Sequence, residues 1–152
     1  MILKKQLDIF RNIFNNHLVV NEVMVCELWE VEGNLKPGTL YPLIVIDLVS
    51  TLQTANSLQR TYRVLCMDIL LKDKSNSEDV LSDSEYILTN FIKTLIDPED
   101  GLELDDMELI NEPLLEPFKE EFGDWCSGYS VEITVESGFD NNPCITLQEW
   151  SQ

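Results

Sequence analysis

The sequence contains one histidine among 152 residues, and this scarcity restricts the catalytic chemistry available to it. Mechanisms built on a Ser–His or Cys–His pair would all have to pass through His17. This residue follows a predicted helix, and a helix-terminal or half-buried histidine is its ordinary interpretation. Neither a Gly-x-Gly-x-x-Gly sequence nor a phosphate-binding Gly-Lys-Ser/Thr loop is present. We therefore expect no catalytic residues, no cofactor and no enzymatic activity.

The four cysteines lack the close pairing that zinc sites need. The two nearest in sequence, Cys126 and Cys144, stand 18 positions apart, whereas zinc ligands usually come two to four residues apart. Cys26 and Cys66 fall inside apolar strand patterns, which predicts buried, reduced thiols in a reducing compartment. A Cys126–Cys144 disulfide is the alternative.

A calcium loop is also missing, although the acidic run from Asp97 to Asp106 contains a glycine. In such loops acids occupy positions 1, 3 and 5 and glycine occupies position 6. With Gly101 at position 6, Ile96 stands at position 1 and Pro98 at position 3, so the pattern fails. We expect no metal ligands, with a weak cation site as the alternative.

Long apolar runs are absent as well. A membrane-spanning helix needs about 20 apolar residues, and the longest unbroken stretch, around Leu43 to Ile46, is far shorter. The first eight residues lack the apolar core and cleavage site of a secretion signal. With 44% hydrophobic and 25% charged residues, the composition is ordinary for one soluble globular domain. We predict a single domain over 1–152 and no membrane partner.

The whole chain has a net charge of −18, and basic residues are scarce in its second half. Residues 1–75 carry eight acidic and eight basic residues, so the whole excess lies in 76–152, where Lys93 and Lys119 accompany 20 acids. Nonspecific DNA binding relies on Lys and Arg at phosphates, so this half cannot hold nucleic acid in that way. Two interpretations stay open: a solvated, self-repelling surface, or a surface that repels DNA or meets a basic partner.

The hydrophobic pattern predicts an α+β fold, in which two amphipathic helices flank an antiparallel sheet of mixed strand order. The first helix is expected from Leu3 to Asn15, where apolar residues recur at steps of three and four. The second is expected from Val80 or Ser82 to Ile96. Ser82 and Glu85 have the spacing of a capping box, and Asp79 is the alternative cap if the helix begins earlier.

Strands are predicted at 22–31, 40–50 and 61–71, as an antiparallel meander with a polar loop over 51–60. Residues 97–121 read as an irregular acidic segment, in which an irregular strand is followed by a loop or short helical turn around Phe118 and Phe122. Strict alternation of apolar and polar residues makes Tyr129–Ser137 the clearest strand. An extended tail is expected over 138–152.

Two segments of the sequence have a recognisable pattern. One runs from Tyr62 to Asp83, a strand, a polar connector and a helix start; the other is Phe122-Gly123-Asp124-Trp125-Cys126-Ser127-Gly128-Tyr129, followed by the alternating strand and by residues 139–144. With the order of elements, they resemble the neck and tail-terminator-type ring proteins of tailed bacteriophages, above all those of crAss-like phages that infect Bacteroides-type hosts. The likeness covers most of Leu40 to Thr146.

The resemblance implies a tail-terminator-like α+β fold without catalytic residues. It also implies a homo-oligomeric ring on the virion axis, assembled in the bacterial cytoplasm, through which DNA passes without specific binding. Other neck, portal or tail proteins would be its partners. The alternative function is a small acidic adaptor or DNA mimic that binds a basic partner.

The acids between Asp97 and Glu121 are too numerous to be paired with Lys119, the basic residue among them. In a ring around DNA, a negative wall would keep phosphates from binding. The candidate site is therefore an exposed, pore-facing or rim surface made by Glu99, Asp100, Asp105, Asp106 and Glu108.

Overall fold

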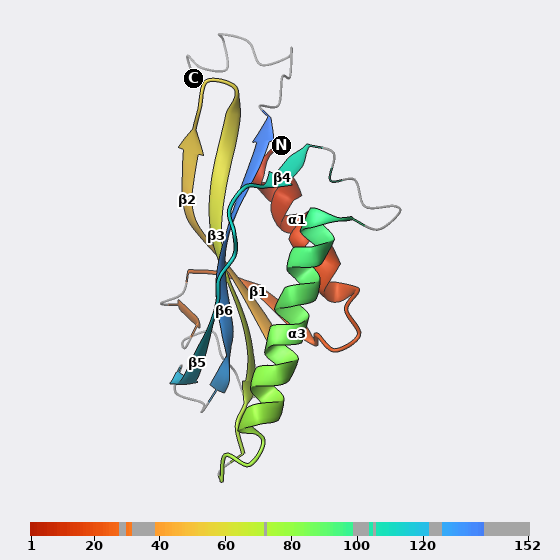
Figure 1. The fold of residues 1–152 in the computed structure, drawn as a ribbon, viewed down its shortest axis with the longest axis vertical. Helices are drawn as coiled ribbons and strands as arrows, with labels where there is room; N and C mark the ends of the chain where they lie inside the picture. The colour runs from red at the N-terminus through yellow and green to blue at the C-terminus, as the bar shows by residue number, and fades with distance from the viewer. Residues whose placement is uncertain are drawn as a thin grey trace.

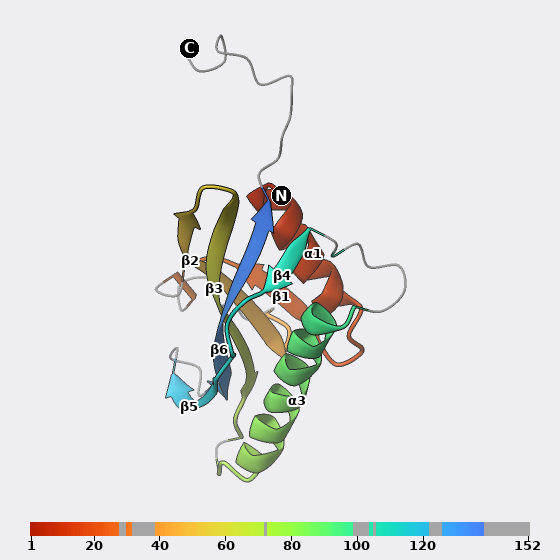
Figure 2. The same cartoon turned by 45° about the horizontal axis from the view of Figure 1, so that its top comes forward.

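The computed structural model describes residues 1–27, 30–31, 39–71, 73–98, 104, 106–121 and 126–138. These form an α+β fold, as the sequence predicts, with a six-stranded mixed sheet and the helices α1 (Leu3–Asn15) and α3 (Ser77–Ile96). Both helices cover the same face of the sheet (Figures 1 and 2). The predicted arrangement of a sheet and two helices is confirmed, but the helices do not lie on opposite faces.

The sheet has a central strand that pairs with three others. Its strands are β1 (Glu22–Val25), β2 (Leu43–Gln53), β3 (Ser57–Ile69), β4 (Met107–Leu109), β5 (Leu115–Glu121) and β6 (Cys126–Gly138). The order is β1-β2-β3-β6-β4, and β5 pairs with β6 beyond the end of β4. Strand β6 therefore lies between β3 on one side and the successive strands β4 and β5 on the other.

Helix α1 has the predicted bounds because its apolar stripe has a partner along its whole length. The ring of Phe10 meets that of Tyr62 edge-on, with 5.0 Å between centroids. The ring of Phe14 stacks on Phe91 of α3 at 4.3 Å. Hydrophobic periodicity does not reveal Gln6, which is buried in the same stripe and accepts a hydrogen bond from the Tyr62 hydroxyl.

Helix α3 begins at Ser77, so the predicted capping box at Ser82 and Glu85 is wrong. Asn76 occupies the N-cap position, but its side chain turns to the end of β3, where it donates to the Ile69 carbonyl and accepts from the Leu71 N–H. Two acids of the first turn, Glu78 and Asp79, favour this start because they lie at the positive end of the helix dipole.

The sheet has an apolar core on each face. The larger core lies between the sheet and the two helices, where Ile44, Tyr62 and Ile133 are wholly buried. A smaller core on the opposite face includes Leu43 and Met67. The first four residues of β2 are buried, with side chains in both cores.

Three strand predictions are wrong in an informative way. Residues 51–60 form most of a β-hairpin, because β2 runs on to Gln53 and β3 starts at Ser57. The first strand ends at Val25 and is parallel to β2, so the first three strands are not an antiparallel meander. Phe118 lies on strand β5, whereas Phe122 and residues 139–152 of the expected tail lie outside the described residues.

The alternation predicted for Tyr129–Ser137 is confirmed along β6. Val131, Ile133 and Val135 are buried on the helix side, whereas Glu132 is exposed on the other face. Near the start of this strand, a Cβ atom on Gly128 would lie 1.8 Å from the Cys66 carbonyl oxygen of β3. Only glycine permits this approach of the two backbones.

Candidate functional site

The structure describes two of the five predicted acidic site residues. Asp106 and Glu108 lie at β4 and are exposed, whereas Glu99, Asp100 and Asp105 lie outside the described residues. Strand β4 is at the end of the sheet order, so both side chains border the molecular surface. That these acids line a pore or rim stays a prediction.

Glu108 lies directly opposite Glu136 in the antiparallel pairing of β4 with β6. Side chains of such a pair share one face of the sheet, and like charges there are destabilising. The amide of Gln59, on β3, donates to Glu136 Oε2 at 2.8 Å and so stabilises one of the two carboxylates. No signal of local spacing could have revealed this pair, because the two glutamates are distant in sequence.

Asp106 has an ionic partner that the charge pattern does not suggest. Its Oδ2 atom lies 3.6 Å from the amino group of Met1, which also donates to the Gly138 carbonyl oxygen at 2.6 Å. One acid of the acidic segment is thus paired within the chain, although the sequence offered only Lys119 nearby.

These acids border an open cleft of about 490 Å³ at the tip of the β2–β3 hairpin. Its lining is polar and includes three carboxylates, those of Asp106, Glu108 and Glu136. The remaining lining residues come from the hairpin tip and the neighbouring strand ends: Thr54, Asn56, Ser57, Met107, Ser137 and Gly138. A surface of this kind repels phosphates and offers acceptors to a basic group.

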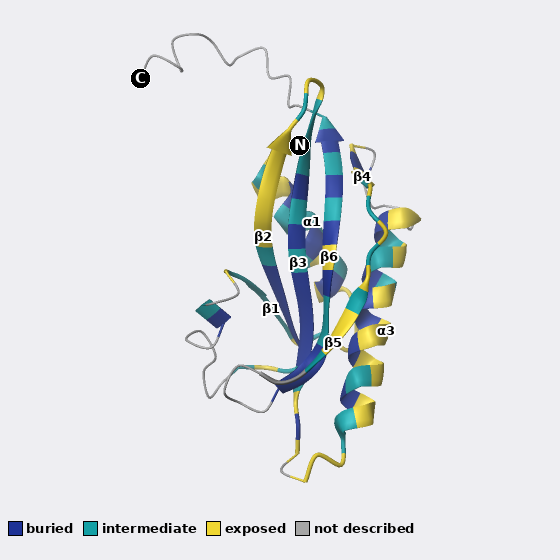
Figure 3. Ribbon diagram, turned by 60° about the vertical axis from the view of Figure 1, so that its left-hand side comes forward, coloured by how far each residue is buried: buried dark blue, intermediate teal, exposed yellow. Residues whose placement is uncertain are grey.

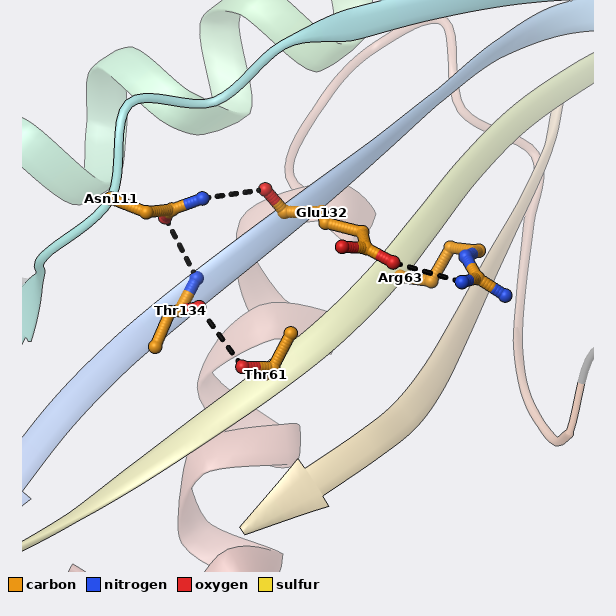
Figure 4. Close-up of polar contacts among 5 residues, drawn as sticks. All are labelled: Thr61, Arg63, Asn111, Glu132 and Thr134. Atoms are coloured by element: carbon orange, nitrogen blue, oxygen red, sulfur yellow. Dashed lines mark hydrogen bonds and ion pairs between the residues drawn. The ribbon is translucent and has the colours of Figure 1, made fainter. Parts of the chain in front are cut away.

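A ladder of polar side chains continues from the cleft across the face of the sheet that the helices leave uncovered (Figure 4). Thr61 and Thr134 share a hydrogen bond of 2.9 Å, and Arg63 Nη2 lies 2.8 Å from Glu132 Oε1. Beyond the end of β4, Asn111 takes the place of a strand residue: its amide donates to the Glu132 carbonyl and accepts from the Thr134 N–H.

All three arginines of the chain are engaged within the fold. Arg60 is 6% exposed and donates to the Met1 carbonyl oxygen at 2.9 Å. Arg63 pairs with Glu132, and Arg11 pairs with Asp8 at 2.9 Å. Arginine is the side chain best suited to hold phosphates, and here each of its guanidinium groups already has a partner.

His17 lies just beyond the end of α1, as the sequence predicts. Its Nδ1 atom accepts from the Val19 N–H at 3.3 Å, and its Nε2 atom lies 3.4 Å from the Asn90 amide nitrogen. Its ring meets that of Tyr86 edge-on at 6.0 Å. These contacts hold the ring against α3.

The two cysteines predicted to be buried, Cys26 and Cys66, differ in their burial. Cys66 lies in the larger core, and burial raises the pKa of its thiol to about 12. Cys26 is half-buried, so the prediction of burial holds fully for Cys66 alone. Cys126 is buried and its sulfur lies 3.9 Å from the Tyr41 hydroxyl. Cys144 lies outside the described residues.

Within the described part of the chain, no group of three or more His, Cys, Asp or Glu residues could hold a metal ion. None of the described helices combines the length and apolar character needed to cross a bilayer. No protein-family model and no curated protein matches the sequence.

Proposed function

We propose that this chain is a structural subunit of an oligomeric ring at the head–tail junction of a tailed bacteriophage, a neck or tail-terminator protein through which DNA passes. It would act in the virion after assembly in the bacterial cytoplasm, in contact with neighbouring neck, portal or tail proteins. The chain would perform no reaction. Its task would be to leave an opening that DNA traverses without adhering.

The observation that carries this proposal is the opposition of Glu108 and Glu136 beside Asp106 at one cleft. Two glutamates opposite each other weaken the sheet in an isolated subunit. Such a cost is understandable where the surface faces a polyanion, because the phosphates then meet no lysine or arginine that could replace their counterions. The partners that the three arginines have within the chain support the same interpretation.

The ring is tested by the mass of the purified protein. Light scattering coupled to gel filtration should give several times the 17.5 kDa of one chain, and electron microscopy of the same fraction should show closed rings with a central opening. A monomer at all concentrations, without rings in the presence of neck or portal proteins, would contradict the proposal.

The acidic surface is tested by reversing its charge. In the double variant Asp106→Lys/Glu108→Lys, we expect binding to a duplex DNA of about 30 base pairs that weakens steeply as salt rises, with the fold retained. The matched control, Asp83→Lys/Glu112→Lys, makes the same charge change on two exposed residues that do not line this cleft. Equal DNA binding by both variants would show that net charge, and not this surface, excludes DNA.

The second candidate is an acidic adaptor or DNA mimic. Three carboxylates around one cleft favour it, because a basic side chain of a partner could enter there. This function needs no ring, so a monomeric mass together with binding to a basic protein that the double variant abolishes would select it over the ring.

A further inference from the structure

The outer edge of β2 loses its neighbour half-way along the strand. Strand β1 pairs with residues Leu43–Ile46 alone, and no other described strand lies beside the remainder of that edge. From Leu48 to Gln53 every residue is exposed, including Leu48 (36%), Val49 (46%) and Leu52 (59%). Figure 3 shows this exposed half of β2 next to the buried half. We call Leu48–Gln53 the β2 edge segment.

Two hydrogen bonds reveal which backbone groups of the β2 edge segment point outward, because successive residues of a strand turn their N–H and C=O groups to opposite edges. The Cys26 N–H donates to the Ile46 carbonyl at 3.1 Å, so Ile46, and Leu48 two residues on, point away from β3. At the hairpin tip, the Thr54 N–H donates to the Ser57 carbonyl at 2.9 Å, so Thr54 points toward β3.

Counting back from Thr54, the residues that point outward are Gln53 and Thr51. The change of alternation between Leu48 and Thr51 is accounted for by the register shift between Leu48 and Ser50, where the strand contains one extra residue. The backbone groups of Leu48, Thr51 and Gln53 therefore form an open row along this edge.

The β2 edge segment lacks the devices that usually prevent strand addition. Natural proteins protect sheet edges with charged residues, prolines and very short strands. The twelve residues Leu48–Gln59 contain no charged residue and no proline, although the chain has a net charge of −18. The opposite edge of the sheet differs: β4 has three residues with Glu108 at its centre, and β5 contains Pro117 beside Glu116.

We propose that the β2 edge segment is the surface through which two copies of this chain pair, edge to edge and antiparallel. An uncharged edge is where two chains of charge −18 can approach without placing acid against acid. A strand that adds to this edge must be uncharged and must have an open row of outward N–H and C=O groups. The β2 edge segment of a second copy meets both requirements. The same segment on both partners makes the contact isologous, so it closes as a dimer.

The direction of the backbone groups selects the register. Antiparallel strands exchange hydrogen bonds between residues that both point toward the partner. A two-fold axis at Leu52 satisfies this condition, because it sets Thr51 of each copy opposite Gln53 of the other. Leu52 then faces Leu52 of the second copy in a non-hydrogen-bonded pair, where side chains lie closest.

The first test is the mass of the chain over a range of concentrations, measured by sedimentation equilibrium. We expect the wild-type mass to rise toward twice that of the unit that pairs, which is one chain of 17.5 kDa or, where the ring forms, one ring. Thr51→Pro removes an outward N–H without removing a bond to β3, and Leu52→Lys places two positive charges opposite each other. Both variants should keep the mass of that single unit, whereas Leu114→Lys, which changes a 70% exposed leucine ahead of β5, should behave as wild type.

A positive readout comes from cross-linking. Leu52→Cys should form an intermolecular disulfide under mild oxidation, because the Cα atoms of a non-hydrogen-bonded pair are about 4.5 Å apart, within disulfide range. Leu114→Cys should not form one. Absence of the cross-link, or a wild-type chain that stays monomeric at all concentrations, would overturn the inference.

This pairing does not depend on the ring. If the wild type forms rings and Thr51→Pro halves their mass, both proposals stand, since two rings are then joined through β2. If Thr51→Pro leaves the ring mass unchanged, the β2 pairing is wrong and the ring stands. If the wild type is a dimer that Thr51→Pro dissociates and no ring forms with neck or portal proteins, the pairing stands and the ring is wrong.

Discussion

The hydrogen bond between Tyr62 and Gln6 allows a direct measurement of what a polar contact contributes inside this core. Tyr62 lies on β3 and Gln6 on α1, both are wholly buried, and the tyrosine hydroxyl donates to Gln6 Oε1. The Nε2 atom of Gln6 has no hydrogen-bond partner among the described residues. Burial, the largest influence, raises the pKa of Tyr62 well above its usual value, so the hydroxyl stays a donor throughout the neutral range.

Tyr62→Phe removes the hydroxyl and preserves the ring, so the edge-on contact with Phe10 stays in place. The carbonyl oxygen of Gln6 is then buried without a donor, which costs about 1–3 kcal/mol. Out of a typical free energy of unfolding of about 5–15 kcal/mol, this loss is easily measured. Gln6→Met removes the orphaned amide together with the acceptor, and leaves one unpaired hydroxyl in a site of similar volume.

The double variant Gln6→Met/Tyr62→Phe leaves no polar group at this contact, so it should lose less stability than the two single variants together. Urea unfolding followed by circular dichroism gives the three free energies, and the coupling energy should be about 1 kcal/mol or more. Additive losses would mean that the hydroxyl and the amide do not interact in the folded protein. A neutral Tyr62→Phe would show that water reaches Gln6.

Three further predictions concern single side chains. Ile133→Asp buries an unpaired charge in the larger core and should lower the free energy of unfolding in urea by several kcal/mol. Glu132→Gln weakens an exposed ion pair and should lower it by about 1 kcal/mol or less. Equal losses would mean that the alternation of β6 is misassigned. Cys66 should react with a thiol reagent far more slowly than half-buried Cys26 in native protein, because burial raises the pKa of the Cys66 thiol and keeps it protonated and out of reach of the reagent. Equal rates in the native state would contradict its burial. Burial, as the largest cause, raises the pKa of Asp68 in the folded protein above 3.8. The contribution of Asp68 to stability therefore declines as the pH rises from about 3.8 through the folded pKa. Asp68→Asn should be more stable than wild type at pH 7 and equal to it at lower pH, and a difference that does not change with pH would refute this assignment.

The sequence predicted best those elements whose own residues carry the whole signal. Helix α1 and strand β6 each bury one regular stripe, so a period of three to four or of two is enough to locate them. The start of α3 was missed because Asn76 makes its hydrogen bonds to the end of β3 and not to its own helix. These hydrogen bonds depend on the position of β3, which the spacing of residues in the helix does not reveal.

Residues 51–60, the distal part of the β2–β3 hairpin, were predicted as a loop because this stretch is mostly polar and contains few residues that favour strands. Pairing with β6 and with each other makes these residues strands, without the burial that creates an apolar pattern. The acidic site shows the same limit. Exposure of Asp106 and Glu108 could be expected from their charge, but the opposition of Glu108 to Glu136 and the ion pair of Asp106 arise from tertiary pairing.

The central place of β6 has a consequence for how the chain folds during synthesis. Of all the described strands, β6 leaves the ribosome last, yet β3 needs it along thirteen paired positions and β4 and β5 have it as their partner. While residues 126–138 are still inside the exit tunnel, one edge of β3 lacks its partner strand and the acidic strands β4 and β5 cannot pair. Folding of the sheet must therefore wait until residues 126–138 have left the exit tunnel, and a nascent chain stalled before Cys126 should be a substrate for chaperones.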